Sequence, residues 1–503
     1  MISRRQYLKT GSTLLALLGS SCATAKAATA PGNQVTLQYD VVVVGAGTGG
    51  LVTAIQAHDL GLKPIVVEKM ECPAGNTIYA MGSFAAFGTN LQNEAGVKDS
   101  KEAFYRDFMK VSEDRADPEL VQVYVDNISE AVNWLQKDLG IAFKPLKKGV
   151  FSRWPAVDGK GITGGGQLIR SLVKEAEKRK IPFLFNAKVN NLLVNERGHV
   201  IGVTAQSDDE IKTIHAKDGV VIATGGFSGN SEMLNTYMGG TLSRLCLRGS
   251  PYVTGENVTL TRPLGARLVN MDQFHCGPIV ADTHLNPNIV INSGTGFEID
   301  ENGKRFVDEN SVYTAKCRTT VLKTRRNMGW HIMSSNCERT KAAVEKYKKL
   351  NTVFYEGNTP QELAQKLGID PKAFVELFNA YNKAVKDNTL KNWEPPCTLK
   401  NPVELTEAPF YAFPFQGGIT ATFGGPKINT NAQIINNEGR PIRGLYAVGN
   451  AAGGLFFANY IGGAQLGGAT VFGRKAAAHM ACAPSRASLY RVQIPNLPDE
   501  GKG

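Results

Sequence analysis

Residues 40–68 hold the pattern that most narrowly restricts how this chain can fold. An apolar run leads into Gly45, Gly47 and Gly50, and a second apolar run ends in Glu68. Glycines let the backbone approach a pyrophosphate, the N-terminus of the following helix offers amides to it, and the acid accepts hydrogen bonds from a ribose. Because strand, turn, helix, strand and acid follow in the right order, the segment predicts a dinucleotide-binding βαβ unit.

The N-terminus predicts export. Arg4 and Arg5 precede a short apolar run, and residues 25–27 form a small-x-small cleavage pattern. This is the pattern of a twin-arginine signal peptide over residues 1–27, which implies a periplasmic mature protein. The apolar run is too short to cross a bilayer, so no integral membrane segment is expected in the mature chain.

Charge and cysteine spacing limit the partners. The formal charge of +11 falls to +7 without the predicted signal peptide, and no basic run is interleaved with aromatic residues as nucleic-acid binding would require. The eight cysteines include no CxxC pair, so no haem, iron–sulfur or other metal site is predicted. We therefore expect electrons to come from a separate donor protein, a cytochrome or a flavoprotein, or from a diffusible carrier.

The rest of the chain alternates helices and strands. Residues 120–140 carry apolar residues alternately four and three apart, which predicts a long helix against a core, and residues 164–180 predict another helix. Residues 187–203 alternate like an antiparallel ribbon, and residues 219–227 are typical of a buried strand that lies beside the first one. The predicted fold class is α/β.

Several separated motifs together resemble the succinate dehydrogenase/fumarate reductase flavoprotein family. They appear in the family's order and cover the chain from residue 38 to about 480. The motifs lie at residues 218–227, 254–257 (with Glu256 in place of the family's Asp), 408–412, 420–425 and 443–450.

This resemblance implies a Rossmann-like FAD-binding domain of residues 38–269 and 420–490, interrupted by an α+β capping domain of residues 270–419. No histidine stands at residues 74–77, where covalently flavinylated members carry one, so noncovalent FAD is expected. The helix that begins near residue 462 is expected to direct its amides at the flavin N1/C2 edge. The residues implied to line the FAD are Gly45, Ala46, Gly47, Gly50, Glu68, Lys69, Asn76, Thr77, Gly82, Val189, Thr224, Gly225 and Glu256, with Ala421, Asn450, Gln465 and Leu466 on the other side.

The family's substrate residues are mostly replaced here. Tyr313 stands where the dicarboxylate reductases carry their general-acid Arg, and Tyr460 stands where they carry a carboxylate-binding Arg. Thr420 replaces a His, and only His275 is retained among the carboxylate ligands. The two proton-relay positions fall on Ile289 and Asn292. With both guanidiniums missing, nothing is expected to offset the desolvation of a dicarboxylate, so fumarate is not the expected substrate.

Tyrosines at these two positions are similar to the 3-oxosteroid dehydrogenases of the same superfamily. That resemblance implies that Tyr313 transfers a proton, while the Tyr460 hydroxyl and the Ala464 amide polarise the substrate carbonyl.

We therefore expect an exported FAD enzyme that reduces a carbonyl-activated C=C bond, of the enone or acrylate type, as a terminal step of anaerobic respiration. Three alternatives stay open. One is the reverse reaction, a dehydrogenase that desaturates a ketone. Another is an acrylate-type reductase that holds the carboxylate with His275 alone. The last is a noncatalytic flavin electron-transfer subunit.

Overall fold

The computed structural model describes residues 35–146, 153–207 and 210–482. The predicted signal peptide lies outside these residues. The described chain divides into two compact units. The large unit contains residues 35–226, 256–270 and 424–482, and the small unit contains residues 227–255 and 271–423. The bounds of the flavin and capping domains given above stay a prediction.

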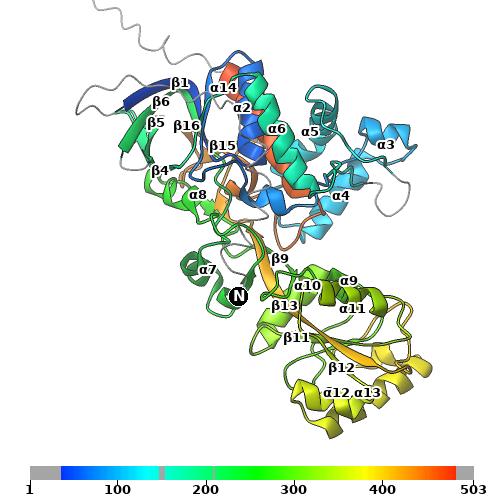
Figure 1. The fold of residues 1–503 in the computed structure, drawn as a ribbon. Coiled ribbons are helices and arrows are strands. Elements are labelled where there is room, and N and C mark those ends of the chain that lie inside the picture. Colours follow the sequence, from blue (N-terminus) through cyan, green and yellow to red (C-terminus); the bar gives the residue numbers. More distant parts are fainter. Residues whose placement is uncertain (1–34, 147–152, 208–209, 483–503) are drawn as a thin grey trace, which may run out of the picture. The chain divides into compact units, whose positions relative to one another are not determined.

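A mostly parallel sheet forms the centre of the large unit, with strand order β15-β16-β6-β1-β2-β3 (Figure 1). β1 (Val35–Val44) runs parallel to both β2 (Pro64–Val67) and β6 (Glu210–Ile222). The valine run of β1 is buried on both faces, which is how a central strand of a parallel sheet is recognised. The remaining strands of this path are β3 (Phe183–Leu184), β15 (Gln433–Ile435) and β16 (Pro441–Ala447). The predicted α/β class is confirmed.

The predicted ribbon and helices are present in the large unit. β4 (Ala187–Val194) pairs antiparallel with β5 (Val200–Ser207), and β5 also pairs antiparallel with β6. α5 (Pro118–Lys137) buries the predicted apolar face, and Asp117 caps its N-terminus. α6 (Gly164–Lys178) is the second predicted helix. Shorter elements are η1 (Gly75–Tyr79), α3 (Asn90–Glu94), α4 (Lys101–Val111), α8 (Glu256–Thr259), η3 (Arg262–Leu264), β8 (Leu268–Val269), β14 (Gly425–Pro426) and η5 (Gly449–Ala451).

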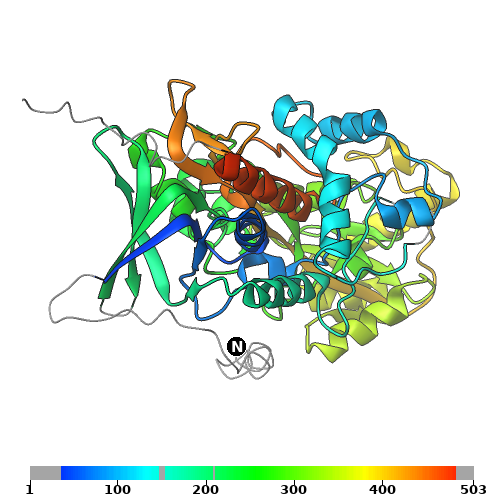
Figure 2. The same cartoon turned by 90° about the horizontal axis from the view of Figure 1, so that it is seen from above.

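Two helices from opposite ends of the chain pack together beside this sheet. α2 (Thr48–Asp59) follows the glycine turn, and α14 (Ala464–Cys482) runs beside it (Figures 1 and 2). Gly473 makes the contact close, because a Cβ there would lie 3.0 Å from Thr53 Oγ1 and 3.1 Å from the Gly49 carbonyl oxygen. The late segment of the chain is thereby fixed next to the first βαβ unit.

The small unit is built around one long strand, β13 (Phe410–Thr422) (Figure 1). Its first half pairs with β11 (Gly329–Ser334) and β12 (Tyr355–Gly357), and its second half pairs with β7 (Cys246–Leu247) and β9 (Phe274–Ile279). The other elements are α7 (Ser231–Met238), η2 (Leu242–Arg244), α9 (Asn288–Ile291), β10 (Phe297–Ile299), α10 (Tyr313–Lys323), α11 (Thr340–Lys349), α12 (Pro360–Leu367), α13 (Pro371–Lys386) and η4 (Leu390–Asn392).

A buried ion pair connects α10 to β10. The Lys316 ammonium donates to Glu298 Oε1 at 3.0 Å and to the Ile291 carbonyl oxygen at 2.6 Å. His331 Nδ1 lies 3.3 Å from the same carboxylate oxygen. Burial acts to raise the pKa of Glu298, but Lys316 and His331 together hold it below its ordinary value. The pair therefore fixes the position of the helix that begins with Tyr313.

Among residues 35–146, 153–207 and 210–482, no helix is both long and apolar enough to cross a membrane. Within the same residues, no group of histidine, cysteine and acidic side chains is arranged to hold a metal ion.

Candidate flavin and substrate site

Two glycines of the turn are required by the fold of the protein itself. Gly45 has φ +108°, and a Cβ there would lie 2.6 Å from the Ala223 carbonyl oxygen. A Cβ on Gly50 would overlap the Gly45 carbonyl oxygen. Neither position accepts a side chain, because backbone atoms cannot move aside.

Gly47 differs from these two glycines. It precedes the first residue of α2 in an extended conformation, with φ −78° and ψ −177°, that any residue adopts. Among the described residues, apart from its own chain neighbours, the one atom within 4 Å of a Cβ built there is Thr77 Oγ1, at 4.0 Å. The first turn of α2 carries no acidic side chain. The protein leaves room above a helix N-terminus, which is the arrangement that a pyrophosphate requires.

Glu68 holds the glycine turn against the end of β2. One carboxylate oxygen accepts a hydrogen bond from the Ala46 amide at 2.7 Å, and the other accepts one from the Met70 amide at 3.0 Å. Burial raises the pKa of Glu68, and these backbone hydrogen bonds oppose that shift. Each carboxylate oxygen has a further lone pair, so the predicted contact with a ribose hydroxyl is compatible with this geometry.

The segment after β2 is held close to the turn by glycines and a threonine pair. Thr77 Oγ1 lies 3.0 Å from Thr48 Oγ1 at the start of α2. A Cβ on Gly165, in the first turn of α6, would overlap the Thr77 carbonyl oxygen, and one on Gly82 would lie 2.5 Å from the Gly164 carbonyl carbon. The predicted residue Thr77 is thus placed beside the N-terminus of α2, and Gly82 beside the N-terminus of α6.

An ion pair joins two more of the predicted residues. Lys69, directly after Glu68, donates to Glu256 Oε1 at 2.7 Å. Thr224 and Gly225 follow the end of β6. Thr224 lies against the glycine turn, because a Cβ on Gly45 would be 3.2 Å from the Thr224 amide nitrogen. Val189 is buried in β4. Glu68, Thr77 and residues 223–224, from three separate segments, therefore lie against residues 45–48 of the glycine turn and the start of α2.

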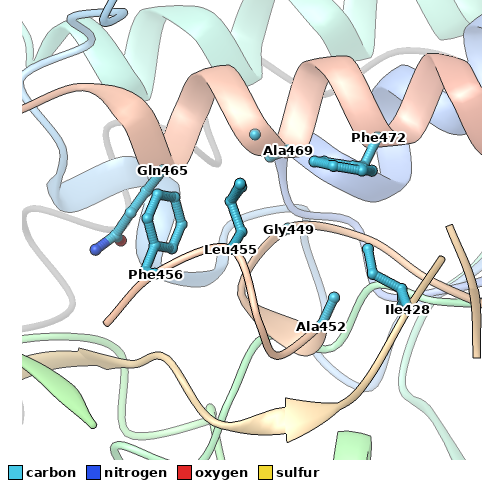
Figure 3. A pocket seen from close by; sticks show the side chains of 9 residues that line it. Ile428, Gly449, Ala452, Leu455, Phe456, Gln465, Ala469 and Phe472 are labelled. Atoms are coloured by element: carbon cyan, nitrogen blue, oxygen red, sulfur yellow. The ribbon is translucent and has the colours of Figure 1, made fainter. Parts of the chain in front are cut away.

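Asn450 and Gln465 meet at the start of α14. Asn450 Nδ2 donates to Gln465 Oε1 at 3.0 Å. Gln465 Nε2 is buried and, among the described residues, has no acceptor. A small and mainly apolar pocket lies here, with Gln465 and Phe456 at one end and Phe472 at the other (Figure 3). Leu466 is buried next to Gln465. A buried amide donor without an acceptor fits a site that receives a polar ligand.

Three predicted substrate residues lie in the small unit. His275 is on β9, and its ring meets the Tyr313 ring edge-on at a centroid distance of 6.2 Å. Ala421, predicted to contact the flavin, is the cross-strand partner of His275, and Thr420 precedes it on β13. Burial raises the pKa of the Tyr313 phenol above 10. Burial and the nearby Arg248 lower the pKa of His275 to about 3, so this imidazole is neutral at physiological pH.

Arg248 is the residue that the sequence interpretation missed. Its Nη1 donates to Thr420 Oγ1 at 2.9 Å, and its charge influences the pKa of both His275 and Tyr313. The two family arginines are replaced by tyrosines, but a different guanidinium lies beside Thr420. Arg248 lies in none of the recognised motifs, and only the pairing of β7 with β13 brings it beside Thr420.

The remaining catalytic candidates lie in the large unit. The Tyr460 ring lies 5.7 Å from the Phe456 ring, measured between centroids. Ala464 is the first residue of α14, and its amide donates to the Ile461 carbonyl oxygen at 2.9 Å. In this conformation the Ala464 amide already has an acceptor, and its donation to a substrate carbonyl stays a prediction, as does that of the Tyr460 hydroxyl. Ile289 and Asn292, the two relay positions, carry no titratable group.

Comparison with known proteins agrees with this arrangement. The profile of the FAD binding domain family matches residues 40–470. The chain is 32% identical over 441 residues to the NADH:fumarate oxidoreductase of Klebsiella pneumoniae, a match that covers 86% of this chain and 47% of that protein. It therefore spans about half the length of that relative. It is 28% identical over 460 residues to the urocanate reductase of Eggerthella lenta, covering 89% and 75% of the two chains.

Solved structures show the same fold. An open conformation of a flavocytochrome c3 fumarate reductase has a TM-score of 0.77 and 27% identity, covering 94% of this chain and 81% of that one. A 3-ketosteroid-Δ4-(5α)-dehydrogenase of Rhodococcus jostii has a TM-score of 0.73 and 23% identity, covering 91% and 99%. The second likeness concerns the fold alone.

Proposed function

The chain belongs to the FAD binding domain family, in the succinate dehydrogenase/fumarate reductase group of flavoproteins, and we propose that it is a reductase of carbonyl-activated C=C bonds. The cofactor is FAD. The observation that carries the proposal is the half-buried, protonated Tyr313 next to His275 and the Arg248–Thr420 pair. A proton donor beside polar groups that can orient a carbonyl is what such a reduction requires.

The residues of the large unit fit the cofactor. Gly47 and the N-terminus of α2 suit the pyrophosphate, and Glu68 and the Lys69–Glu256 pair flank it. The unpaired Nε2 of Gln465 is a donor for a flavin or ribose oxygen. When bound and reduced, FAD supplies a hydride to the substrate carbon that is β to the carbonyl. No histidine stands at residues 74–77, so the proposal includes a noncovalent cofactor.

The protein's own part in the reaction is proton delivery and carbonyl polarisation. Tyr313 gives its hydroxyl proton to the α-carbon as the double bond becomes saturated, and solvent then restores that proton. The raised pKa of Tyr313 keeps the phenol protonated at neutral pH, which favours donation over abstraction. The reductive direction is therefore favoured over the desaturation of a ketone. The Tyr460 hydroxyl is the proposed donor to the carbonyl oxygen as charge accumulates there.

The relatives support the same chemistry. One is named for the reduction of fumarate and another for the reduction of urocanate. Each of these compounds is a conjugated acid, so both names describe the saturation of a C=C bond next to a carboxyl group.

We further propose that the twin-arginine segment exports the chain to the periplasm. There it would receive electrons from a separate cytochrome or flavoprotein. A respiratory role is part of the same proposal, since the enzyme would pass electrons from that donor to its substrate. The mild excess of basic residues in the mature sequence suits an acidic donor.

The decisive experiment is reoxidation of the reduced enzyme. The FAD is reduced anaerobically with a viologen, and conjugated enones, unsaturated acids and steroid ketones are then added while the flavin absorbance is followed. Reoxidation by at least one C=C compound, with formation of its saturated product, is expected. A protein that accepts and releases electrons but is reoxidised by none of these compounds would be an electron carrier, and the proposal would be wrong.

A further inference from the structure

We propose that Arg248 binds the carboxylate of the substrate, and that the substrate is an α,β-unsaturated monocarboxylate. This inference rests on the proposed reductase function and specifies its substrate class. The negative charge of the substrate would then be recognised by Arg248, which lies outside the family motifs.

The structure provides a dedicated place for the Arg248 side chain. Gly277 of β9 and Gly418 of β13 are cross-strand partners. A Cβ on Gly277 would overlap the Arg248 guanidinium, and a Cβ on Gly418 would lie 2.6 Å from Arg248 Cγ and 2.7 Å from Cδ. The Arg248 side chain therefore lies against two paired glycines, and a side chain at either position would occupy its place. The Arg248 amide donates to the Ile419 carbonyl oxygen at 2.8 Å, which fixes the start of the side chain.

Within the described part of the chain, the Arg248 guanidinium has no carboxylate counter-ion. Its one side-chain hydrogen bond within the described part of the chain goes from Nη1 to Thr420 Oγ1, at 2.9 Å. Across residues 35–146, 153–207 and 210–482, no aspartate or glutamate lies within ion-pair distance of it. Arg248 is half-buried, and a guanidinium has five N–H donors in a planar fork. Such a group matches a carboxylate, which accepts two parallel hydrogen bonds.

Arg248, His275, Tyr313 and Thr420 form one group of side chains, and Arg248 carries its charge. His275 is neutral at physiological pH because burial and Arg248 depress its pKa, and Tyr313 is neutral because burial raises its pKa. Thr420 carries no charge. One fixed positive charge balances one carboxylate, whereas a dicarboxylate would leave a second carboxylate to be desolvated without a partner. A neutral ketone would leave the guanidinium itself without an anion.

The proton donor stands close to this cation. The Tyr313 ring contacts the His275 ring, and the positive charge of Arg248 lowers the Tyr313 pKa against the larger effect of burial. A carboxylate held by Arg248 would therefore bring its own α-carbon toward the tyrosine, which is the carbon that must receive the proton.

The test compares matched acids and esters. Acrylate, crotonate and cinnamate are each paired with the methyl ester, which keeps the C=C bond and the carbonyl but removes the charge. The kcat/KM of acid and ester is measured for the holoenzyme and for Arg248→Gln and Arg248→Lys. Arg326→Gln is the control, because Arg326 is an exposed arginine of the same unit and its loss removes the same formal charge.

Arg248→Gln is expected to lower the acid-to-ester ratio of kcat/KM by about ten- to a hundredfold, the usual effect of losing a hydrogen bond to a charged group. Most of the change should appear in KM for the acid. Arg248→Lys should recover part of the ratio, because it restores the charge without the planar fork. Arg326→Gln should leave the ratio unchanged. An equal loss for acid and ester in Arg248→Gln would show a purely structural role and overturn the proposal.

A binding measurement separates this proposal from the reductase proposal. Propanoate, butanoate and 3-phenylpropanoate, the saturated acids, are tested for thermal stabilisation of the holoenzyme against their methyl esters. Stabilisation of the wild type but not of Arg248→Gln by an acid supports the role of Arg248 even if no C=C compound is reduced. If esters are reduced but no acid binds or reacts preferentially, the reductase function stands and the role of Arg248 is refuted.

Discussion

Gly47→Ala should separate cofactor binding from folding. The structure places Gly47 at the N-terminus of α2 with φ −78°, where alanine is unstrained, and a Cβ would find only Thr77 Oγ1, at 4.0 Å. Because the substitution also restricts the unfolded chain, the apoprotein should keep its stability or gain roughly 0.4–1 kcal/mol. The same methyl group would occupy the space through which the backbone amides approach the pyrophosphate.

The expected loss of FAD affinity follows from those amides. If the methyl group prevents two charge-assisted hydrogen bonds, each contributing about 1.5–3 kcal/mol, binding weakens by about 3–6 kcal/mol. This corresponds to a dissociation constant roughly a hundred- to ten-thousandfold higher. The measurement is a titration of apoprotein with FAD, followed by flavin fluorescence, together with thermal unfolding of the apoprotein.

Gly50→Ala is the matched comparison. It adds the same methyl group three positions later, where it overlaps the Gly45 carbonyl oxygen, so it should destabilise the apoprotein by at least about 1–3 kcal/mol. Gly47→Ala protein that binds FAD as tightly as the wild type would show that the cofactor does not approach this turn. Equal destabilisation by both substitutions would show that the space beside Gly47 belongs to the fold.

Four further outcomes are expected. The FAD should be released by acid or heat without proteolysis, and yellow colour that stays on the denatured polypeptide would refute noncovalent binding. Tyr313→Phe should lower turnover about a hundredfold with FAD still bound, and wild-type activity should fall only at alkaline pH, as the raised pKa of this acid is approached; full activity of the Phe variant would exclude the role. Lys316→Met should lower the free energy of unfolding by about 3–5 kcal/mol in thermal unfolding, because it leaves the buried Glu298 carboxylate without its cation. Adding Glu298→Leu should recover most of that loss, and a mild effect of the single change would contradict this account. Lys at both Arg4 and Arg5 should leave FAD-loaded protein in the cytoplasm, and normal periplasmic accumulation would disprove twin-arginine export.

The first βαβ unit could be predicted from sequence because its determinants are local. The valines of β1, Gly45 and Glu68 lie within one short segment. The valines pair with β2, Gly45 leaves no room for a Cβ, and Glu68 accepts a hydrogen bond from the Ala46 amide. What the sequence did not reveal is that Glu68 also binds the Ala46 and Met70 amides, since the glycine turn must be folded before those amides point at it.

The substrate side was harder to predict, since its residues come from strands that are far apart in the sequence. The resemblance to known flavoproteins identified His275, Tyr313 and Thr420, and the structure brings the first two into ring contact. It supplied no motif for Arg248, because β7 is only two residues long and has no pattern of its own. The pairing of β7 with β13 is a tertiary fact that local propensities do not contain.

Arg248 changes which substrate the site favours. The sequence interpretation removed two guanidiniums and concluded that nothing offsets the desolvation of a dicarboxylate, which left both enones and acrylates, the latter held by His275, as candidate substrates. The structure places one cation, Arg248, against Gly277 and Gly418, where a Cβ on either glycine would meet its side chain. A half-buried guanidinium without a counter-ion is retained at a cost in solvation, and an anionic substrate offsets that cost while a ketone does not. The same tyrosine can protonate the α-carbon of either compound. The charge, and not the proton donor, therefore distinguishes an unsaturated acid from an enone at this site.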